Sequence, residues 1–175
     1  MKKQPEITQQ TRNNIITAFC RLYEMEPIEQ LYVKDVIAVA GYNRSTFYEY
    51  FTDIYDLLAQ IEDDVIRYIK NGIENGVHGQ TELLRLLSEK EDYLKVLLGP
   101  YGEVHFQNRL RNEFMQNQEK STADKRLGAY LSEFHMTVSL AMYRLWLRQK
   151  DMTLEELAQL IDILYTTGAS GISET

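Results

Sequence analysis

Cysteine, proline and glycine are scarce in this sequence, which has one, three and nine of them among 175 residues. The single cysteine, Cys20, excludes an internal disulfide and a metal site built from several thiolates. That usage favours the reducing environment of the cytoplasm. Long apolar runs are also missing, since no stretch approaches the roughly 20 consecutive apolar residues that a membrane-spanning helix needs. Residues 1–14 contain two lysines but no apolar core, so we expect neither a signal peptide nor a membrane partner.

Motifs of catalysis and of metal binding are absent as well. The three histidines, His78, His105 and His135, lie far apart and match no metal-ligand spacing. The sequence contains no GxSxG nucleophile elbow, no P-loop and no GxGxxG dinucleotide motif. Adjacent carboxylates such as Glu155 and Glu156 are typical of a solvated helix face. We therefore expect no enzyme activity, no metal and no cofactor.

The composition that remains is that of a helical globular protein. Hydrophobic residues make up 44% and charged residues 26% of the chain, which excludes a disordered or collagen-like protein. Low glycine and proline content favours helix, and apolar residues recur at three- and four-residue spacing instead of alternating. The sequence therefore predicts an all-α fold. The expected helices cover about 9–25, 33–40, 43–51, 53–70, 81–88, 90–98, 103–119, 125–150 and 153–168.

Short signals mark several of the expected helix boundaries. Pro27 ends the first helix because proline lacks a backbone donor. Gly41 can adopt the left-handed conformation that often follows the last turn of a helix. Asp53 and Thr153 are expected to be N-caps of the helices that follow them. Residues 71–79, NGIENGVHG, are the one plausible linker in the chain.

The segment 33–51 carries the most specific pattern in the chain. Two short helices joined at Gly41 are typical of a helix-turn-helix, whose second helix enters the major groove of DNA. The expected buried positions are Val36, Ile37, Ala40, Phe47 and Phe51. The expected exposed positions are Tyr42, Asn43, Arg44, Ser45, Thr46, Tyr48 and Tyr50. Arginine can bind guanine edges and hydroxyl groups suit phosphates, whereas the alternative is a polar surface over an aromatic core patch.

A set of residues within positions 8–60 has a distinctive arrangement. The set comprises Thr11-Arg12, Ile15, Ala18, Leu22-Tyr23, Val36, Ala40-Gly41, Thr46-Phe47-Tyr48, Tyr50-Phe51 and Leu57-Leu58. In this arrangement the chain resembles the TetR family of bacterial transcriptional repressors. The rest of the chain resembles the family in length and helical layout. Its segments SEKEDYLKVLLG and HFQNRLRNEF are similar to a C-terminal domain common among Firmicutes members.

The resemblance implies a homodimeric repressor of about nine helices. A helix-turn-helix DNA-binding domain would cover 1–52, and a helical ligand-binding and dimerisation domain would cover 53–175, with a connecting helix from residue 53. The two N-terminal domains would enter successive major grooves of a palindromic double-stranded DNA operator. In this comparison Arg44, Ser45 and Thr46 lie at the operator-reading start of the recognition helix. Tyr48 and Tyr50 lie where the family contacts phosphates and neighbouring bases, and Lys34 can approach a base or the backbone.

Two positions depart from the family pattern, and the overall charge is unfavourable for DNA. Tyr32 stands where the family often has threonine, and Ile54 stands where a lysine usually reaches a phosphate. The net charge is −7, and residues 1–60 hold six Lys and Arg against eight Asp and Glu. We expect the charge to be segregated by face, with Lys2, Lys3 and Arg12 in a basic arm. The alternative function is a helical protein-interaction module of the same fold that has lost DNA binding.

The expected helix over 125–150 is apolar on two faces, so it must be covered on two sides. One cover can be the core and the other a second subunit, with the last helix completing a four-helix bundle. The alternative is a single well-buried core helix. The family commonly encloses a small-molecule effector among its C-terminal helices. Candidate lining residues are Tyr93, Phe106, Arg109, Phe114, His135, Met142, Tyr143 and Trp146. The alternative places most of these side chains in the core or at the subunit interface.

Overall fold

The computed structural model of the protein describes residues 5–114 and 125–173. Within these ranges all regular structure is helical, which confirms the all-α prediction there. The described helices are α1 (Pro5–Tyr23), the 3-10 turn η1 (Ile28–Gln30), α2 (Val33–Ala40), α3 (Arg44–Tyr48), α4 (Ile54–Glu74), α5 (Gly79–Ser88), α6 (Glu91–Leu97), α7 (Glu103–Phe114), α8 (Lys125–Gln149) and α9 (Leu154–Ser173). Residues 115–119 of the expected 103–119 helix lie outside the described residues.

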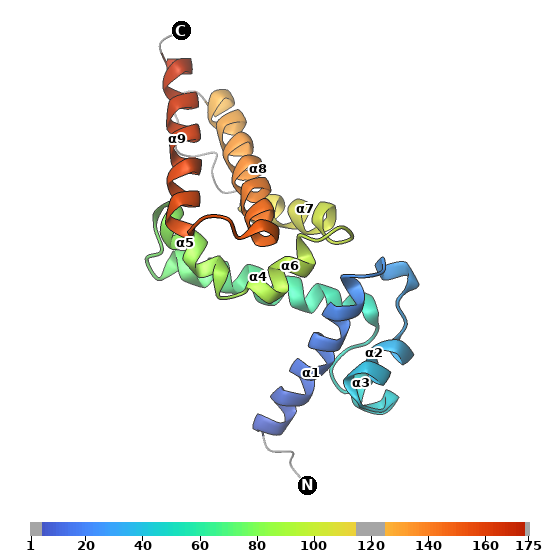
Figure 1. Ribbon diagram of the computed structural model, residues 1–175. Coiled ribbons are helices and arrows are strands. Elements are labelled where there is room, and N and C mark those ends of the chain that lie inside the picture. The colour runs from blue at the N-terminus through green and yellow to red at the C-terminus, as the bar shows by residue number, and fades with distance from the viewer. Residues whose placement is uncertain (1–4, 115–124, 174–175) are drawn as a thin grey trace.

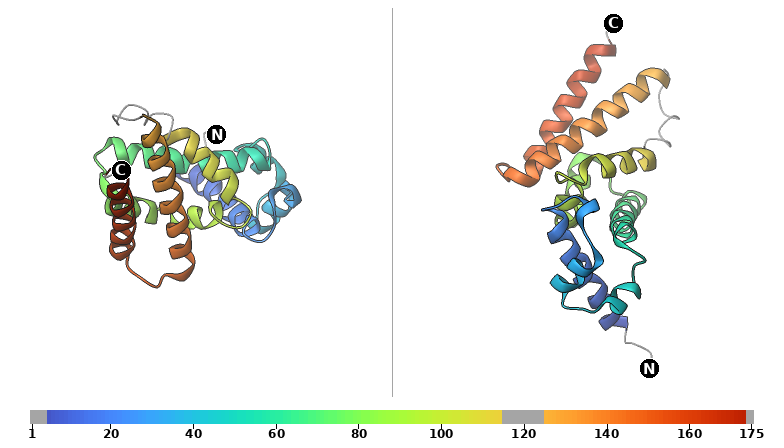
Figure 2. Two further views of the ribbon diagram at one scale, coloured as in Figure 1. Left: turned by 90° about the horizontal axis from the view of Figure 1, so that it is seen from above. Right: turned by 90° about the vertical axis from the view of Figure 1, so that its right-hand side faces the viewer.

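The helices form two groups at opposite ends of an elongated molecule, and α4 runs between them (Figures 1 and 2). At one end, α1 packs on α2 and α2 packs on α3. At the other end α8 and α9 stand side by side, and α9 also packs on α5. Along its length α4 contacts α5, α6 and α7. This arrangement places the α2–α3 unit far from the α8–α9 pair.

Aromatic side chains form the core of the N-terminal group. Phe19, Phe47 and Phe51 are fully buried, and the ring centroids of Phe47 and Phe51 lie 5.4 Å apart. Val36 of α2 belongs to the same core, and Ile37 packs against it half-buried. Because Phe47 and Phe51 are four residues apart, they face the same side of the chain. The opposite side of α3 is left toward solvent.

Polar side chains cap the helices that the sequence signals marked. At the start of α4, Asp53 accepts a hydrogen bond from the backbone N–H of Asp56 at 2.8 Å. At the start of α9, the Thr153 hydroxyl accepts from the Glu156 N–H at 3.1 Å, and the Glu156 carboxylate accepts from the Thr153 N–H at 2.7 Å. This reciprocal pair is a capping box. Both expected N-caps are therefore confirmed.

Several expected helix bounds are wrong. The helix expected over 9–25 is Pro5–Tyr23 and ends before Pro27, and the helix expected over 43–51 is Arg44–Tyr48. Two further helices extend past glycines that were expected to lie beyond their ends. α4 continues to Glu74, through the first part of the segment that looked like a linker. Gly72 lies so close to Leu86 of α5 that a Cβ atom would overlap that side chain, so this glycine permits close helix packing. α9 runs through Gly168 to Ser173. A glycine inside a helix costs only about 1 kcal/mol, which the packing of a long helix offsets.

No described helix combines the length and the apolarity needed to cross a bilayer. Within residues 5–114 and 125–173, no three His, Cys, Asp or Glu side chains are grouped so as to hold a metal ion. Cys20 packs half-buried against the core. Burial, and to a smaller extent the nearby Glu24 carboxylate, raises the pKa of its thiol to about 12.

Candidate nucleic-acid interface and internal cavity

The turn between α2 and α3 depends on one glycine and on hydrogen bonds to two preceding helices. Gly41 follows α2 with a φ of 74°, a left-handed conformation in which other residues are strained. The backbone N–H groups of Gly41 and Tyr42 both donate to the carbonyl of Ile37. The Tyr42 hydroxyl accepts a hydrogen bond from Asn14 of α1 at 3.0 Å. The start of α3 is therefore tied to both α1 and α2.

Asn43 organises the first turn of α3. Its Oδ1 accepts hydrogen bonds from the Thr46 N–H at 2.9 Å and from the Ser45 hydroxyl at 2.6 Å. The Thr46 hydroxyl donates to the same oxygen at 3.1 Å. A side-chain acceptor at the N-cap stabilises a helix start, which matters for a helix of only five residues. The same contacts hold both hydroxyl groups beside the N-terminus of α3.

Arg44 is the exposed cation at the start of α3, and Tyr48 positions it. Arg44 Nη2 and Nε donate to the Tyr48 hydroxyl at 3.0 and 3.3 Å. The guanidinium also lies over the Tyr48 ring, 5.5 Å from its centroid. A guanidinium has five N–H groups, so this contact leaves donors for a second partner. The geometry suits a planar acceptor such as a guanine edge or a phosphate.

Lys34 of α2 is a second exposed cation of the α2–α3 unit. Its Nζ lies 5.2 Å from the centroid of the Tyr32 ring, a cation–π contact. Tyr32 is one of the two departures from the family pattern. Its ring is exposed and contacts the Lys34 ammonium group. The other departure, Ile54, is buried in the core at the start of α4 and brings no cation to the surface.

The structure divides the eight residues predicted to contact DNA into two sets. The exposed set is Lys34, Asn43, Arg44, Ser45 and Tyr48. The half-buried set is Tyr42, Thr46 and Tyr50, for which the expected exposure is wrong. Tyr42 and Tyr50 also pack against the hydrophobic core, so each presents only part of its surface to a ligand. Their contacts with DNA stay predictions, and the exposed set has the freer access.

Arg12 was expected in a basic arm, and it lies instead in an internal contact between α1 and α4. Its Nη2 donates to Asp64 at 2.9 Å and to Gln60 at 3.1 Å. Its guanidinium lies 5.7 Å from the centroid of the Phe51 ring. The side chain is 19% exposed and pairs with Asp64, so its charge is already neutralised within the fold. Lys2 and Lys3, the other members of the expected arm, lie outside the described residues.

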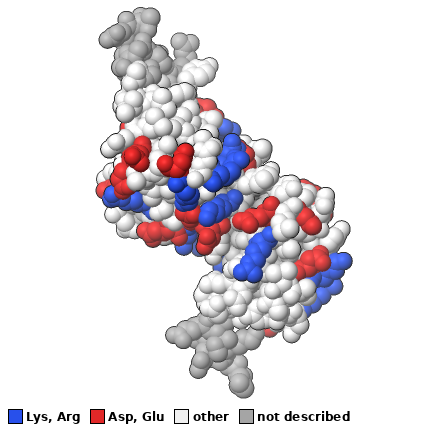
Figure 3. Space-filling view, in the orientation of Figure 1, with Lys and Arg blue, Asp and Glu red and all other residues white. Residues whose placement is uncertain are grey.

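Charges of both signs are mixed on the face of the molecule seen in Figure 3. Lys and Arg side chains alternate with Asp and Glu side chains across the middle of this face. The visible part of the α8–α9 end carries few charges below its grey tip. A surface of mixed sign gives only weak long-range attraction to DNA.

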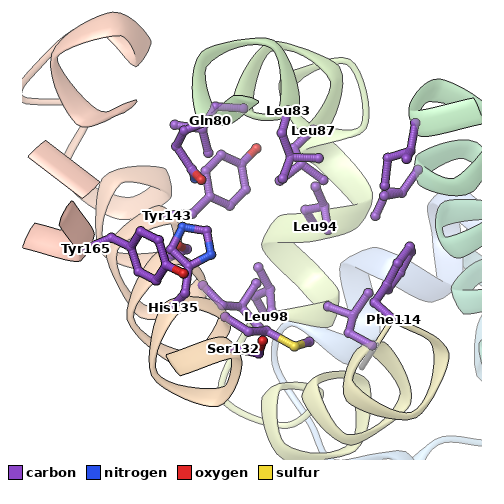
Figure 4. A pocket seen from close by; sticks show the side chains of 17 residues that line it. Gln80, Leu83, Leu87, Leu94, Leu98, Phe114, Ser132, His135, Tyr143 and Tyr165 are labelled. Carbon is purple, nitrogen blue, oxygen red and sulfur yellow. The ribbon is translucent and has the colours of Figure 1, made fainter. Parts of the chain in front are cut away.

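A cavity of about 410 Å³ lies among the C-terminal helices, and side chains from each of α4 to α9 line it (Figure 4). Its walls are mainly leucine, with Ile69 and Ile73 from α4. Three of the eight expected lining residues, Phe114, His135 and Tyr143, line this cavity. Their role in binding stays a prediction, but the structure brings these three side chains to one space.

The other five expected lining residues lie elsewhere. Tyr93 lines a surface hollow between α1 and α6. Arg109 lines a second hollow, between the end of α1 and α7. Phe106 and Trp146 are buried in the core, and Met142 packs against it. These three line neither the cavity nor the two hollows.

The sequence did not predict most of the polar side chains that line the cavity. They belong to Gln80, Ser132, Ser139 and Tyr165. The Ser139 and Tyr143 hydroxyls are buried without a hydrogen-bond partner among the described residues. The His135 ring packs against Tyr165 with 4.4 Å between centroids, and burial lowers the pKa of His135 against a smaller opposing effect of Asp162. The four-residue spacing of His135, Ser139 and Tyr143 on one helix was the signal that could have found Ser139.

A buried carboxylate between α4 and α7 was also missed. Glu62 is 1% exposed, and its carboxylate accepts a hydrogen bond from Arg109 Nη1 at 2.7 Å and contacts His105 Nδ1 at 2.8 Å. Arg109 also pairs with Asp63. Burial opposes the charge of Arg109, but the two carboxylates outweigh it and raise the pKa of the guanidinium. Arg109 is therefore an ion-pair partner of α4, and it does not line the cavity that His135 lines.

No protein-family model and no curated protein matches the sequence. Solved structures do match, and their fold is that of TetR-family transcriptional regulators. At sequence identities near 20% such a likeness shows a shared fold. The chain therefore has the TetR-like all-α fold.

Three of these structures cover nearly the whole chain. A TetR transcriptional regulator from Streptococcus agalactiae 2603V is 21% identical with a TM-score of 0.62, over 91% of this chain and 96% of that chain. A structure named as a TetR-family transcriptional regulator from Syntrophomonas wolfei is 19% identical with a TM-score of 0.63, over 93% and 96%. The dihydroxyacetone kinase operon activator DhaS is 20% identical with a TM-score of 0.56, over 90% and 95%.

Proposed function

We propose that the protein is a cytoplasmic transcriptional regulator that binds DNA through α2 and α3. In this proposal it is a repressor that binds a palindromic operator as a homodimer and responds to a small-molecule effector. The likeness to solved transcriptional regulators supports the general class. Operator binding, the dimer and the effector each rest on features of this chain.

The observation that carries the proposal is the preorganised start of α3. Arg44 is exposed and held by Tyr48, at the first residue of a helix whose N-cap, Asn43, is also exposed. Such a short, capped helix with an outward arginine suits insertion into a major groove, where arginine distinguishes guanine from the other bases. Lys34 on the preceding helix can add a contact to the DNA backbone.

The proposed dimer rests on the outer faces of α8 and α9. On α8 the side chains of Tyr130, Phe134 and Leu145 are exposed, and on α9 those of Ile163 and Leu164 are exposed. Contiguous exposed apolar surface on a protein of this size marks an interaction site. Two copies that pair these faces across a two-fold axis would form the four-helix bundle, and the two α2–α3 units would then bind two half-sites.

A helical protein-interaction module without DNA binding is the second candidate. Two observations favour it: Arg12 is committed to Asp64 within the fold, and Ile54 places no cation at the start of α4. Both reduce the number of phosphate contacts, and each lost contact removes part of the salt-dependent affinity.

Selection of bound fragments from random genomic DNA separates the two candidates. We expect the full-length protein to enrich a palindromic sequence, because each subunit of a dimer reads one half-site. Replacing Arg44 with alanine should then relax one base position in each half-site and cost about 1–3 kcal/mol of binding free energy. If the protein is a repressor, deletion of its gene should raise the expression of a reporter gene placed behind the enriched sequence.

Arg67→Ala is the matched control for Arg44→Ala. Arg67 is an exposed arginine on α4 that pairs with Asp64, so the two variants lose the same charge at different places. The control should bind the enriched sequence as the wild type does. Failure to enrich any sequence at several salt concentrations would support the interaction module. A loss of affinity by Arg44→Ala that is equal on all sequences would make Arg44 a phosphate contact.

A further inference from the structure

The cavity among α4 to α9 is built for a particular chemistry. Its walls come from six helices and consist mainly of Leu, Ile, Phe and Met side chains. No Lys, Arg, Asp or Glu is among the described residues that line it. The imidazole of His135 has its pKa lowered by burial, so the site disfavours the charged form of the ring. A charged ligand would therefore lose its hydration without gaining an opposite charge.

The cavity nevertheless contains hydrogen-bonding groups without partners. Tyr143 is 1% exposed, and its hydroxyl has no hydrogen-bond partner among the described residues. Figure 4 shows the Tyr143 ring extending from α8 into the space beside Gln80 and toward Leu83 and Leu87 of α5. The Ser139 hydroxyl, one turn earlier on α8, is also buried without a partner. A buried hydroxyl without a hydrogen bond is unfavourable, and a ligand that supplies one removes that cost.

We infer that the cavity binds an uncharged, largely apolar small molecule that carries one hydrogen-bonding group for the Tyr143 hydroxyl. The apolar part of the ligand would contact the leucine walls, and a hydroxyl or carbonyl of the ligand would pair with Tyr143 or Ser139. This pairing requires a small displacement of the cavity wall, because both hydroxyl oxygens are buried in the described structure. The regulatory meaning of this site rests on the proposed function, since the ligand would be the effector. Binding itself can be measured without DNA.

Three probes with the same alkyl chain test the charge selectivity of the cavity. Titration calorimetry at pH 7 would compare n-octanol, octanoate and octylamine on the full-length wild-type protein. We expect n-octanol to bind with one site per chain. Octanoate and octylamine should bind at least about tenfold more weakly, because the cavity offers no partner for either charge. Equal or tighter binding of octanoate or octylamine, or no saturable binding of n-octanol, would overturn the inference.

Tyr143→Phe tests the hydrogen-bonding group. This variant keeps the ring and removes the hydroxyl, so the affinity for n-octanol should fall about 2- to 12-fold, the range of one neutral hydrogen bond. Binding of toluene, which cannot form that bond, should be unchanged or tighter. The matched control is Tyr55→Phe, which removes an exposed tyrosine hydroxyl from α4, outside the cavity and outside the proposed dimer face; Tyr55 is 57% exposed. The control should bind both probes as the wild type does. A parallel loss of n-octanol and toluene in Tyr143→Phe would contradict the assigned hydrogen bond.

The outcomes for the cavity and for DNA are separable. If n-octanol binds with the expected selectivity but no DNA sequence is enriched, the cavity inference stands and the proposed regulation fails. If a palindrome is enriched but the three alkyl probes bind alike, the regulator stands and the inference about ligand chemistry fails. Release of the enriched DNA by n-octanol in the wild type, weakened in Tyr143→Phe, would support both.

Discussion

Glu62 is a carboxylate buried between α4 and α7, and two side chains of α7 satisfy it. Arg109 donates to one carboxylate oxygen and His105 contacts the other. His105 is 63% exposed as a side chain, whereas Arg109 is 27% exposed. The arginine is therefore the partner that compensates the buried charge. Because the pair joins α4 to α7, it holds α7 against α4. α4 is also the helix that reaches the N-terminal group.

Removal of Arg109 should consequently be costly for stability. Arg109→Ala leaves the Glu62 carboxylate buried without its cation, and loss of one partner of a buried pair costs about 3–5 kcal/mol. We expect that decrease in the free energy of unfolding, measured by urea denaturation at pH 7. The double variant Glu62→Gln with Arg109→Ala should recover part of it, because the buried charge is then gone.

Arg111→Ala is the control at the residue scale. Arg111 pairs with Glu133 on α8, and both side chains are about two-fifths exposed, so this loss should stay under about 1 kcal/mol. A similar effect of the two alanine variants would mean that burial of Glu62 does not govern the stability of this contact.

The same residue scale shows what a single sequence can and cannot predict about the site. The exposure of Arg44, Ser45 and Asn43 follows from their positions at the start of a short helix, and it was predicted. The pairing of Arg12 with Asp64 joins residues 52 positions apart, and no local pattern specifies such a contact. Glu62 was missed because it occupies an apolar position of α4, which the helical spacing assigned to hydrophobic residues.

At the scale of elements, the short α2–α3 unit depends on its turn more than on its length. Gly41 has a φ of 74° and a Cβ atom there would meet nothing within 4 Å. Any cost of a side chain at Gly41 is therefore a backbone cost. The same holds for Gly76 in the loop between α4 and α5, with a φ of 100° and open space around it. The two glycines form a matched pair at different distances from α3.

Gly41→Ala should lower both stability and DNA affinity, whereas Gly76→Ala should lower stability alone. A left-handed conformation costs a residue with a side chain about 1–2 kcal/mol, so each variant should lose about that much free energy of unfolding in urea. Relief of the strain at Gly41 would rotate α3 relative to α2, and we expect weaker binding to the enriched operator in a fluorescence-anisotropy titration. Unchanged operator affinity in Gly41→Ala, with the stability loss present, would show that the turn does not set the α3 orientation.

Element boundaries could be predicted wherever a side chain or a glycine conformation determines them locally. The bounds of α2 and the caps at Asp53 and Thr153 agree with the sequence signals. The end of α4 could not be predicted because Gly72 serves packing against Leu86, which is known only once α5 is placed. The cavity is harder still, since it exists only when six helices are assembled around it.

At the scale of the whole molecule, hydrogen bonds also join the end of α1 to the C-terminal group. The Tyr23 hydroxyl donates to the Tyr101 carbonyl at 3.1 Å, and the Tyr101 hydroxyl donates to the Met25 carbonyl at 3.2 Å. Together with Arg12 and Asp64, these contacts tie the α1–α3 group to the rest of the chain.

The helix expected over 125–150 has two apolar stripes at helical spacing, one of which contains Tyr143 and Leu147 and the other Tyr130, Phe134 and Leu145. Tyr143 and Leu147 of one stripe are buried within the chain. Tyr130, Phe134 and Leu145 of the other stripe are exposed. The chain therefore leaves these three apolar side chains of α8 uncovered, and Ile163 and Leu164 of the neighbouring helix α9 are exposed as well. This division is the reason to expect a second copy there.

Ile163→Glu should convert the proposed dimer into a monomer. Ile163 is 60% exposed in the single chain, so glutamate at this position leaves the fold of the chain intact. In a two-fold interface the same position occurs on both subunits, and two unpaired carboxylates would be buried at once. We expect the dissociation constant to rise at least about a hundredfold, measured by sedimentation equilibrium at micromolar concentration. Val104→Glu is the control, because Val104 is 74% exposed on α7, which is not one of the two helices proposed to pair. A wild-type protein that sediments as a monomer, or equal dissociation of the two variants, would place the contact between subunits elsewhere.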